Sequence, residues 1–233
     1  MIIAHRGASG IAPESTRAAI REAIRARADM IELDVQLSRD LCLIVFHDDR
    51  LERTTNGSGR VAHTPSRQLL RLDAGSWFHP RFRHERILLL PQALHLIPKH
   101  VGINLELKPT AHRRRVTMEC LRLAHRLRLG RRLLVSSVDP RLLRACRSAG
   151  IACALICRRA PARGLQQAAR LGCEAWHPFH RLVTRQRLAR AHALGLRVRA
   201  WTVDQPRRLR QLADWGVDGV FTNNPAQVRR LLR

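Results

Sequence analysis

A connection of only four residues, Ser38–Leu41, separates two stretches that both have the pattern of a β-strand. Before it, residues 30–37 read MIELDVQL, where apolar and polar residues alternate with the period of two that is typical of a strand. After it, residues 42–47 form a second apolar run. Parallel strands need a crossover of a dozen or more residues, so these two strands are predicted to form an antiparallel hairpin.

Similar short apolar runs recur along the chain and alternate with segments of helical spacing. Nine strands are predicted, at 2–5, 30–37, 42–47, 102–108, 133–138, 151–156, 174–177, 196–203 and 219–223. Helices are predicted at 15–28, 113–129, 140–149, 162–171, 184–194 and 206–215. Without the return strand of the hairpin, eight strands remain, which is the count of a closed (β/α)8 barrel. We therefore expect an α/β fold, a TIM barrel in which residues 1–233 form one domain.

Residues 50–90 interrupt this alternation. Turn signals occur at Asn56-Gly57 and at 73–75, and aromatic residues such as Trp77 gather there. Long connections in compact domains tend to be functional. We expect a small subdomain, inserted after the hairpin and closing over the barrel mouth.

The hairpin is predicted to carry reactive side chains on one face. Glu32 and Asp34 lie two residues apart on the same strand and therefore point to the same side. If the turn is centred between Arg39 and Asp40, paired positions sum to 79 and Glu32 faces His47. Two carboxylates roughly 7 Å apart repel each other unless a cation lies between them.

Active sites of such barrels gather at the carboxyl ends of the strands. The residues predicted there are His5 and Arg6, Glu32 and Asp34, His47, Glu106 and Lys108, and Trp201. The three carboxylates form a candidate site for one hard divalent cation, Mg²⁺ or Ca²⁺. A cation, two basic side chains and two imidazoles suit phosphoryl chemistry with one histidine as acid and the other as base. His177, also near a strand end, is not included in the predicted site.

Composition limits the alternatives. With 43 basic and 18 acidic residues the formal net charge is +25, but the arginines are spread along every helical segment rather than grouped in one block. No apolar stretch approaches the roughly 20 residues of a membrane span, and no leader sequence is recognised. The six cysteines lack a CxxC pair and are predicted to be small buried residues of a cytoplasmic protein, not zinc ligands.

Several stretches resemble the glycerophosphodiester phosphodiesterase family in order and spacing. They are AHRGASGIAPEST, ADMIELDVQLSRD, LIVFHDDRLERTTNGSGRV, LDAGSWF, LELKP, AWTVD and DGVFTNNP. The resemblance implies a barrel that hydrolyses deacylated phospholipid diesters to glycerol 3-phosphate and an alcohol. It implies His5 and His47 as the acid/base pair, Glu32, Asp34 and Glu106 as metal ligands, Arg6 and Lys108 as phosphate-binding residues, and Trp201 in the glycerol pocket.

Three positions depart from that family pattern. Ser15 stands where asparagine is usual, Leu41 where glycine is usual, and Asn223 where aspartate is frequent. Ser15 is expected still to cap a helix. Leu41 brings a β-carbon to a turn position that favours glycine.

Two other functions fit parts of the sequence. One is a related two-histidine barrel phospholipase that acts on intact lysolipid or sphingolipid. The other is a non-catalytic barrel that binds polyanions through its arginines. The expected partner of the preferred enzyme is a small phosphodiester, with no specific nucleic acid.

Overall fold

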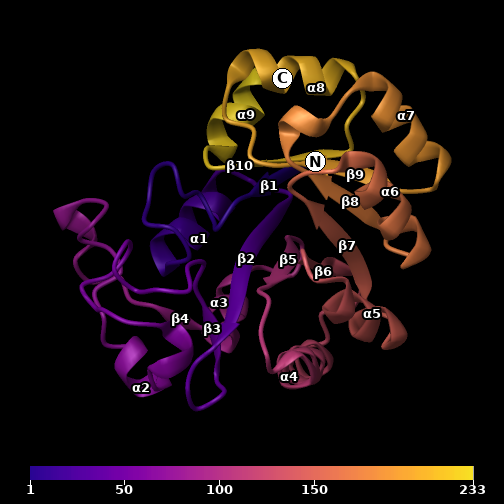
Figure 1. Ribbon diagram of the computed structural model, residues 1–233. Coiled ribbons are helices and arrows are strands. Elements are labelled where there is room, and N and C mark those ends of the chain that lie inside the picture. The colour runs from indigo at the N-terminus through magenta and orange to yellow at the C-terminus, as the bar shows by residue number, and fades with distance from the viewer. Residues whose placement is uncertain (233) are drawn as a thin grey trace.

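The computed structural model describes residues 1–232. Eight parallel strands form a closed ring in the order β1–β2–β5–β6–β7–β8–β9–β10, and β10 pairs with β1. Their bounds are β1 (Ile2–Ala4), β2 (Met30–Leu37), β5 (Gly102–Leu107), β6 (Leu133–Ser137), β7 (Ala152–Cys157), β8 (Ala175–Pro178), β9 (Arg197–Ala200) and β10 (Gly219–Thr222). The predicted (β/α)8 barrel is confirmed (Figure 1).

Helices cover the outside of the ring (Figure 1). They are α1 (Arg17–Arg25), α4 (Arg113–Arg126), α5 (Pro140–Ser148), α6 (Pro161–Arg170), α7 (Arg185–Ala193) and α8 (Pro206–Asp214), all predicted, together with α3 (Leu90–Leu96) and α9 (Pro225–Leu231), which were not. Local signals explain their ends. Asp139 Oδ1 accepts the backbone N–H of Arg141 at 3.0 Å to cap α5, and Gly150 follows this helix with φ +75°.

The apolar residues form two layers around the strands. Inside the ring lies a small cluster of buried residues, Ile3, Met30, Leu134, Ala154, Ala175 and Phe221. A much larger cluster packs the outer faces of the strands against the helices. This interior cluster packs the ring below the pocket that opens at the carboxyl ends of the strands.

The hairpin is present, but its predicted register is wrong by one residue. β3 (Leu43–Val45) pairs antiparallel with β2 through Val35–Val45 and Leu37–Leu43, so paired positions sum to 80. The cause is Leu41, whose φ of +61° puts it in the left-handed region and lengthens the turn. Strand pairing therefore does not place His47 opposite Glu32. His47 follows the end of β3 and reaches the pocket from a loop.

The segment of residues 46–87 contains only short elements, η1 (Val61–His63), α2 (Ser66–Leu69) and η2 (Pro80–Phe82), before β4 (Leu88–Leu89) pairs with β3. It has its own small apolar cluster, which includes Phe46, Leu51, Val61, Leu69 and Ile87. Figure 1 shows this segment beside β2 and α1, on one side of the barrel. Apart from His47, none of its residues lines the pocket described below. The expectation that it closes over the barrel mouth stays a prediction.

The loop between β1 and α1 corrects one expectation about the helix cap. Thr16, not Ser15, caps α1, because its Oγ1 accepts the backbone N–H of Ala19. Ser15 instead has φ +61° and donates its backbone N–H to the Arg6 carbonyl. Asparagine tolerates that left-handed conformation better than most residues, which explains its frequent use at this position.

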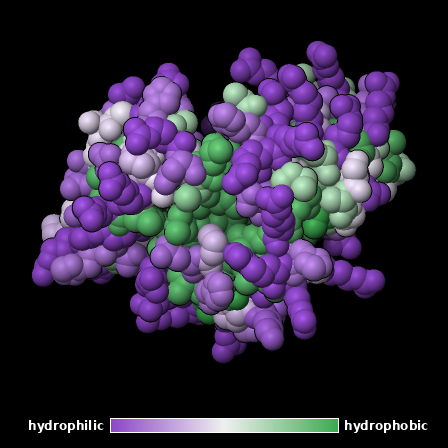
Figure 2. Space-filling view, turned by 90° about the horizontal axis from the view of Figure 1, so that it is seen from below, coloured by the Kyte–Doolittle hydropathy of each residue, from purple (hydrophilic) through white to green (hydrophobic). Residues whose placement is uncertain are grey.

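No helix among the described residues is long and apolar enough to cross a bilayer. On the face seen in Figure 2, hydrophilic side chains surround a central apolar area instead of gathering at one edge. Five of the six cysteines are buried, as predicted, and Cys42 is half-buried.

Candidate active site

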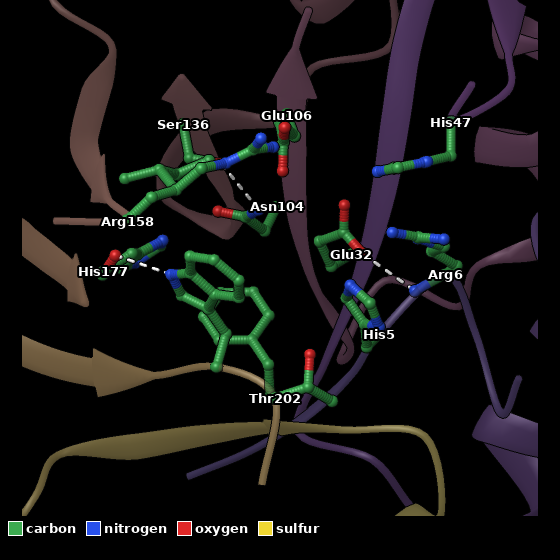
Figure 3. Close-up of a pocket in the computed structure, with 13 residues that line it drawn as sticks. His5, Arg6, Glu32, His47, Asn104, Glu106, Ser136, Arg158, His177 and Thr202 are labelled. Carbon is green, nitrogen blue, oxygen red and sulfur yellow. Dashed lines mark hydrogen bonds between the residues drawn. The ribbon is translucent and has the colours of Figure 1, made fainter. Parts of the chain in front are cut away.

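A cavity of about 130 Å³ opens at the carboxyl ends of the barrel strands. Its walls are made by His5, Arg6, Glu32, His47, Asn104, Glu106, Ser136, Ile156, Arg158, His177, Trp201, Thr202 and Phe221 (Figure 3). Six of the eight residues predicted from the sequence are in this set. The other two, Asp34 and Lys108, lie directly behind it in contact with Glu106 and Arg6.

The three predicted carboxylates meet at one end of the cavity. Glu32 and Asp34 come from β2 and Glu106 from the neighbouring β5, where Asp34 and Glu106 are register partners. One oxygen of each carboxylate lies within 4.8 Å of the others. Glu32 and Asp34 are almost fully buried. Strand alternation thus brings together three acids that the interior of a barrel would otherwise exclude.

Two basic side chains partly balance these acids. Lys108 Nζ lies 2.7 Å from Asp34 Oδ1 and 2.6 Å from Glu106 Oε1. Arg6 Nε lies 3.2 Å from Asp34 Oδ2, and the backbone N–H of Arg6 donates to Glu32 Oε2 at 2.8 Å. With all three carboxylates ionised, these acids and the two basic side chains leave one net negative charge in a buried place. The balance is incomplete without a further cation.

The pKa values of the two buried acids diverge. Burial, and then the charges of Asp34 and Glu106, raise the pKa of Glu32 well above its usual value. Burial also acts to raise the pKa of Asp34, but Lys108 and Arg6 outweigh it and hold that pKa below its usual value. Glu32 is therefore the acid whose ionisation depends most on added positive charge.

These residues fit a hard divalent cation. Glu32 Oε1 is buried and has no hydrogen-bond partner among residues 1–232. Carboxylate oxygens are the donors that Mg²⁺ and Ca²⁺ prefer, and no cysteine or histidine belongs to the cluster. A divalent ion here would change the local net charge from −1 to +1, which suits an anionic substrate.

The two predicted histidines lie on the same side of the cavity, and Figure 3 shows both imidazoles pointing into it. His5 Nδ1 is 2.8 Å from Asn223 Oδ1, and His47 Nδ1 is 2.5 Å from Asp48 Oδ1. Both partners are oxygens that accept, so we assign the proton to Nδ1 in each ring. Each Nε2 is then free to exchange a proton with a substrate.

Asn223 can replace the aspartate that is frequent at this position because of its surroundings. Its Nδ2 donates to Asp204 Oδ2 at 2.6 Å, which turns its Oδ1 toward His5. A carboxylate at 223 would face the carboxylate of Asp204 directly. The amide therefore supports the same orientation of His5 without adding a charge.

The protonation of His5 gives a stability prediction. Burial, and then the charge of Arg6, lower the pKa of His5 from 6.5 to about 4. As pH falls from about 7 to about 5, the unfolded chain takes up a proton at His5 but the folded chain does not. This difference is expected to remove about 2 kcal/mol of unfolding free energy. Urea unfolding in EDTA at both pH values measures this loss. In the His5→Asn variant, the fall in unfolding free energy between pH 7 and pH 5 should be smaller by about 2 kcal/mol. An equal loss in both proteins contradicts the prediction.

Sequence reasoning missed the opposite wall of the cavity. His177, from β8, is 1% exposed, and neither ring nitrogen has a hydrogen-bond partner in the described chain. Asn104 donates to Ser136 Oγ at 2.9 Å, but its Oδ1 also has no partner in that part of the chain. Arg158 lines the same wall. No sequence signal separates His177 and Asn104 from ordinary strand residues, because the lack of partners for these polar atoms among residues 1–232 appears only in three dimensions.

Trp201 lies where it was predicted, just after β9. Its indole Nε1 donates to the His177 carbonyl at 2.8 Å, and its ring packs against Phe179. This bond fixes the indole as a flat apolar wall of the cavity that His177 and Asn104 also line. The cavity therefore has one end with the carboxylates, Arg6 and the two imidazoles, and another end that combines the indole of Trp201 with His177, Asn104 and Arg158.

Comparison with known proteins agrees with this geometry. The model of the glycerophosphoryl diester phosphodiesterase family matches residues 5–227. The YhdW protein of Bacillus subtilis is 38% identical over 96% of this chain and 94% of its own. The glycerophosphodiester phosphodiesterase of Caldanaerobacter subterraneus is 31% identical over 100% of this chain and 98% of its own.

A solved structure extends the likeness to the whole fold. A phosphodiesterase of Oleispira antarctica, in complex with its product sn-glycerol 3-phosphate, has a TM-score of 0.94 and 31% identity, covering 100% of this chain and 96% of its own. Sequence and fold thus agree over essentially the full length. The chain belongs to the glycerophosphoryl diester phosphodiesterase family and is a phosphoric diester hydrolase.

Proposed function

We propose that this enzyme hydrolyses soluble glycerophosphodiesters to sn-glycerol 3-phosphate and an alcohol, with His5 and His47 as the acid/base pair and one divalent cation held by Glu32, Asp34 and Glu106. One observation carries the proposal: two imidazoles lie at the same cavity as the three carboxylates, and each has its Nδ1 hydrogen-bonded to an oxygen outside the cavity. The Oleispira antarctica enzyme supports the product, since it was solved with sn-glycerol 3-phosphate.

The proposed mechanism divides the work among the residues at the charged end. Arg6 and Lys108 bind the phosphate oxygens and hold the phosphorus near both imidazoles. One histidine, unprotonated at Nε2, accepts the proton of the attacking hydroxyl, and the other, protonated at Nε2, donates that proton to the departing alcohol. The attacking hydroxyl is either water, which gives glycerol 3-phosphate directly, or the glycerol 2-hydroxyl, which gives a cyclic phosphate that water then opens. When bound, Mg²⁺ or Ca²⁺ would neutralise charge on the phosphoryl oxygens.

The opposite end of the cavity suits the glycerol moiety. Trp201 offers a flat apolar face, and His177 and Asn104 offer hydroxyl groups polar atoms that have no hydrogen-bond partner among residues 1–232. We propose that the glycerol lies against Trp201 with a hydroxyl on His177. A buried histidine without a partner costs free energy, which such a hydrogen bond would offset.

The His177→Phe variant tests this placement. Phenylalanine keeps an aromatic ring beside Phe221, whose centroid is 4.9 Å away, but cannot hydrogen-bond a hydroxyl. We expect KM for glycerophosphodiesters to rise about threefold to tenfold, the loss of one neutral hydrogen bond, while kcat changes little. Steady-state kinetics provide the measurement. An unchanged KM would show that His177 does not contact the substrate.

One assay separates the proposed function from its rivals. Release of glycerol 3-phosphate from glycerophosphocholine and glycerophosphoethanolamine should occur with Mg²⁺ or Ca²⁺ and stop with EDTA. A barrel phospholipase would instead act on lysolipid vesicles and ignore the soluble diesters. A non-catalytic barrel would show only salt-dependent binding to DNA or anionic vesicles.

We further propose that residues 1–233 form one barrel domain, with about 50–90 as an insertion, and that the enzyme acts in the cytoplasm. Free buried thiols such as Cys146 and Cys173 are typical of a reducing compartment. The proposed substrate is a small molecule, and no specific nucleic acid is expected, since the arginines are spread along the sequence rather than grouped in one block.

A further inference from the structure

Arg53 lies outside the cavity, on the loop that follows β3, and is 46% exposed. Its guanidinium nevertheless joins two carboxylates. Nη1 and Nη2 donate to the two oxygens of Glu14 at 2.9 and 2.7 Å, and Nε donates to Asp48 Oδ2 at 2.5 Å. Three of its donors are thus used in a planar fork, a geometry that lysine cannot reproduce.

Each of these carboxylates also contacts a side chain of the cavity wall. Glu14 Oε1 accepts from Arg6 Nη1 at 2.9 Å. Asp48 Oδ1 accepts from His47 Nδ1 at 2.5 Å. A continuous series of hydrogen bonds therefore runs Arg6–Glu14–Arg53–Asp48–His47. It connects the loop after β1 to the loop after β3, segments that are separated by about a sixth of the chain.

Charges alternate in sign from Arg6 to Asp48 along this series, and its two carboxylates are mostly shielded from solvent. Glu14 is only 12% exposed, and Asp48 is 26% exposed. The bond from Asp48 decides which nitrogen of His47 carries the proton and which way the ring faces. Apart from His47 itself, Arg53 is the one basic side chain among residues 1–232 that pairs with Asp48. Without this guanidinium, Asp48 could turn toward solvent and leave the ring of His47 free to rotate.

We propose that Arg53 is a positioning residue, which sets the orientation of His47 relative to Arg6 through Asp48 and Glu14. This inference rests on the proposed function, in which His47 and Arg6 act on the same phosphate. A displacement of about 1 Å at a reacting group can cost about 100-fold in rate. This role of Arg53 would also involve the segment of residues 46–87 in catalysis, although His47 is the residue of this segment that lines the cavity.

The Arg53→Ala and Arg53→Lys variants test the proposal, with Arg50→Ala as the matched control. Arg50 lies on the same loop and pairs with Glu52 at 2.6 Å, away from the cavity. We expect kcat for glycerophosphocholine to fall about 10-fold to 100-fold in Arg53→Ala, with KM changed less than about threefold. Arg53→Lys should recover only a minor part, and added methylguanidinium should partly restore Arg53→Ala. Arg50→Ala should behave as wild type.

A second readout does not depend on activity. Imidazole ¹⁵N resonances are recorded on enzyme treated with a chelator. They should report a single Nδ1–H tautomer of His47 in wild type and in Arg50→Ala, and a mixture of the Nδ1–H and Nε2–H tautomers in Arg53→Ala. Wild-type kcat in Arg53→Lys, or an unchanged His47 tautomer in Arg53→Ala, would overturn the inference. Wild-type enzyme that releases no glycerol 3-phosphate would instead refute the proposed function, and the resonances would still decide the role of Arg53.

Discussion

Replacing His47 by alanine is expected to lower kcat for glycerophosphodiesters about 10²–10⁴-fold, the usual contribution of a general acid or base. The same loss is expected for His5→Ala. Each imidazole has its Nδ1 bound to an oxygen behind it, which leaves its Nε2 for the proposed proton transfer. KM should change far less, since the proposed phosphate-binding residues Arg6 and Lys108 remain. Initial rates of glycerol 3-phosphate release provide the measurement.

A control and a double variant sharpen this prediction. His84 is exposed on the segment of residues 46–87, so His84→Ala should keep wild-type kcat. Residues that act as a unit in one step show non-additive losses. The variant lacking both histidines should therefore be little worse than the poorer single variant. Full activity in either single variant would refute the assignment of the acid/base pair.

Replacing Glu106 by glutamine is expected to lower activity at a fixed, low concentration of Mg²⁺ at least about 100-fold. The substitution keeps the size of the side chain but removes one of three charges that would bind the cation, which supplies several kcal/mol of transition-state stabilisation. Glu106 is the most exposed of the three acids, and Lys108 retains Asp34 as a partner, so the fold should survive. A higher Mg²⁺ concentration should restore part of the lost rate.

The matched control is Glu119→Gln on the outer face of α4, where the carboxylate pairs with Arg122 at 2.7 Å. This variant should have wild-type activity and wild-type metal dependence. Thermal unfolding of both variants in EDTA reports whether either substitution damages the fold. If Glu106→Gln folds normally and keeps the metal dependence of wild type, Glu106 is not a ligand.

The barrel and the acidic cluster could be predicted from the sequence because both depend on local periodicity. Alternation along residues 30–37 sets Glu32 and Asp34 on one face, and parallel pairing then brings Glu106 of the adjacent strand beside them. The hairpin register could not be predicted, since it depends on the left-handed conformation of Leu41, a residue type that seldom adopts it.

The residues that support the site were missed for a different reason. Arg53 and Glu14 are 39 positions apart on irregular loops, whose course follows no periodic pattern. His177 resembles any buried strand residue until its missing hydrogen-bond partners are seen. Short elements such as α2 and β4 also escaped prediction, because few residues specify them.

A metal titration of enzyme treated with a chelator most directly tests the central proposal, that Glu32, Asp34 and Glu106 hold one divalent cation at the cavity that His5 and His47 also line. Mg²⁺ or Ca²⁺ is added stepwise while binding is followed by calorimetry and glycerol 3-phosphate release by a coupled assay. We predict one binding event per chain that restores activity in proportion, and its loss in Glu106→Gln. Full hydrolysis in excess EDTA, or restoration that is equally strong in Glu106→Gln, would contradict the account.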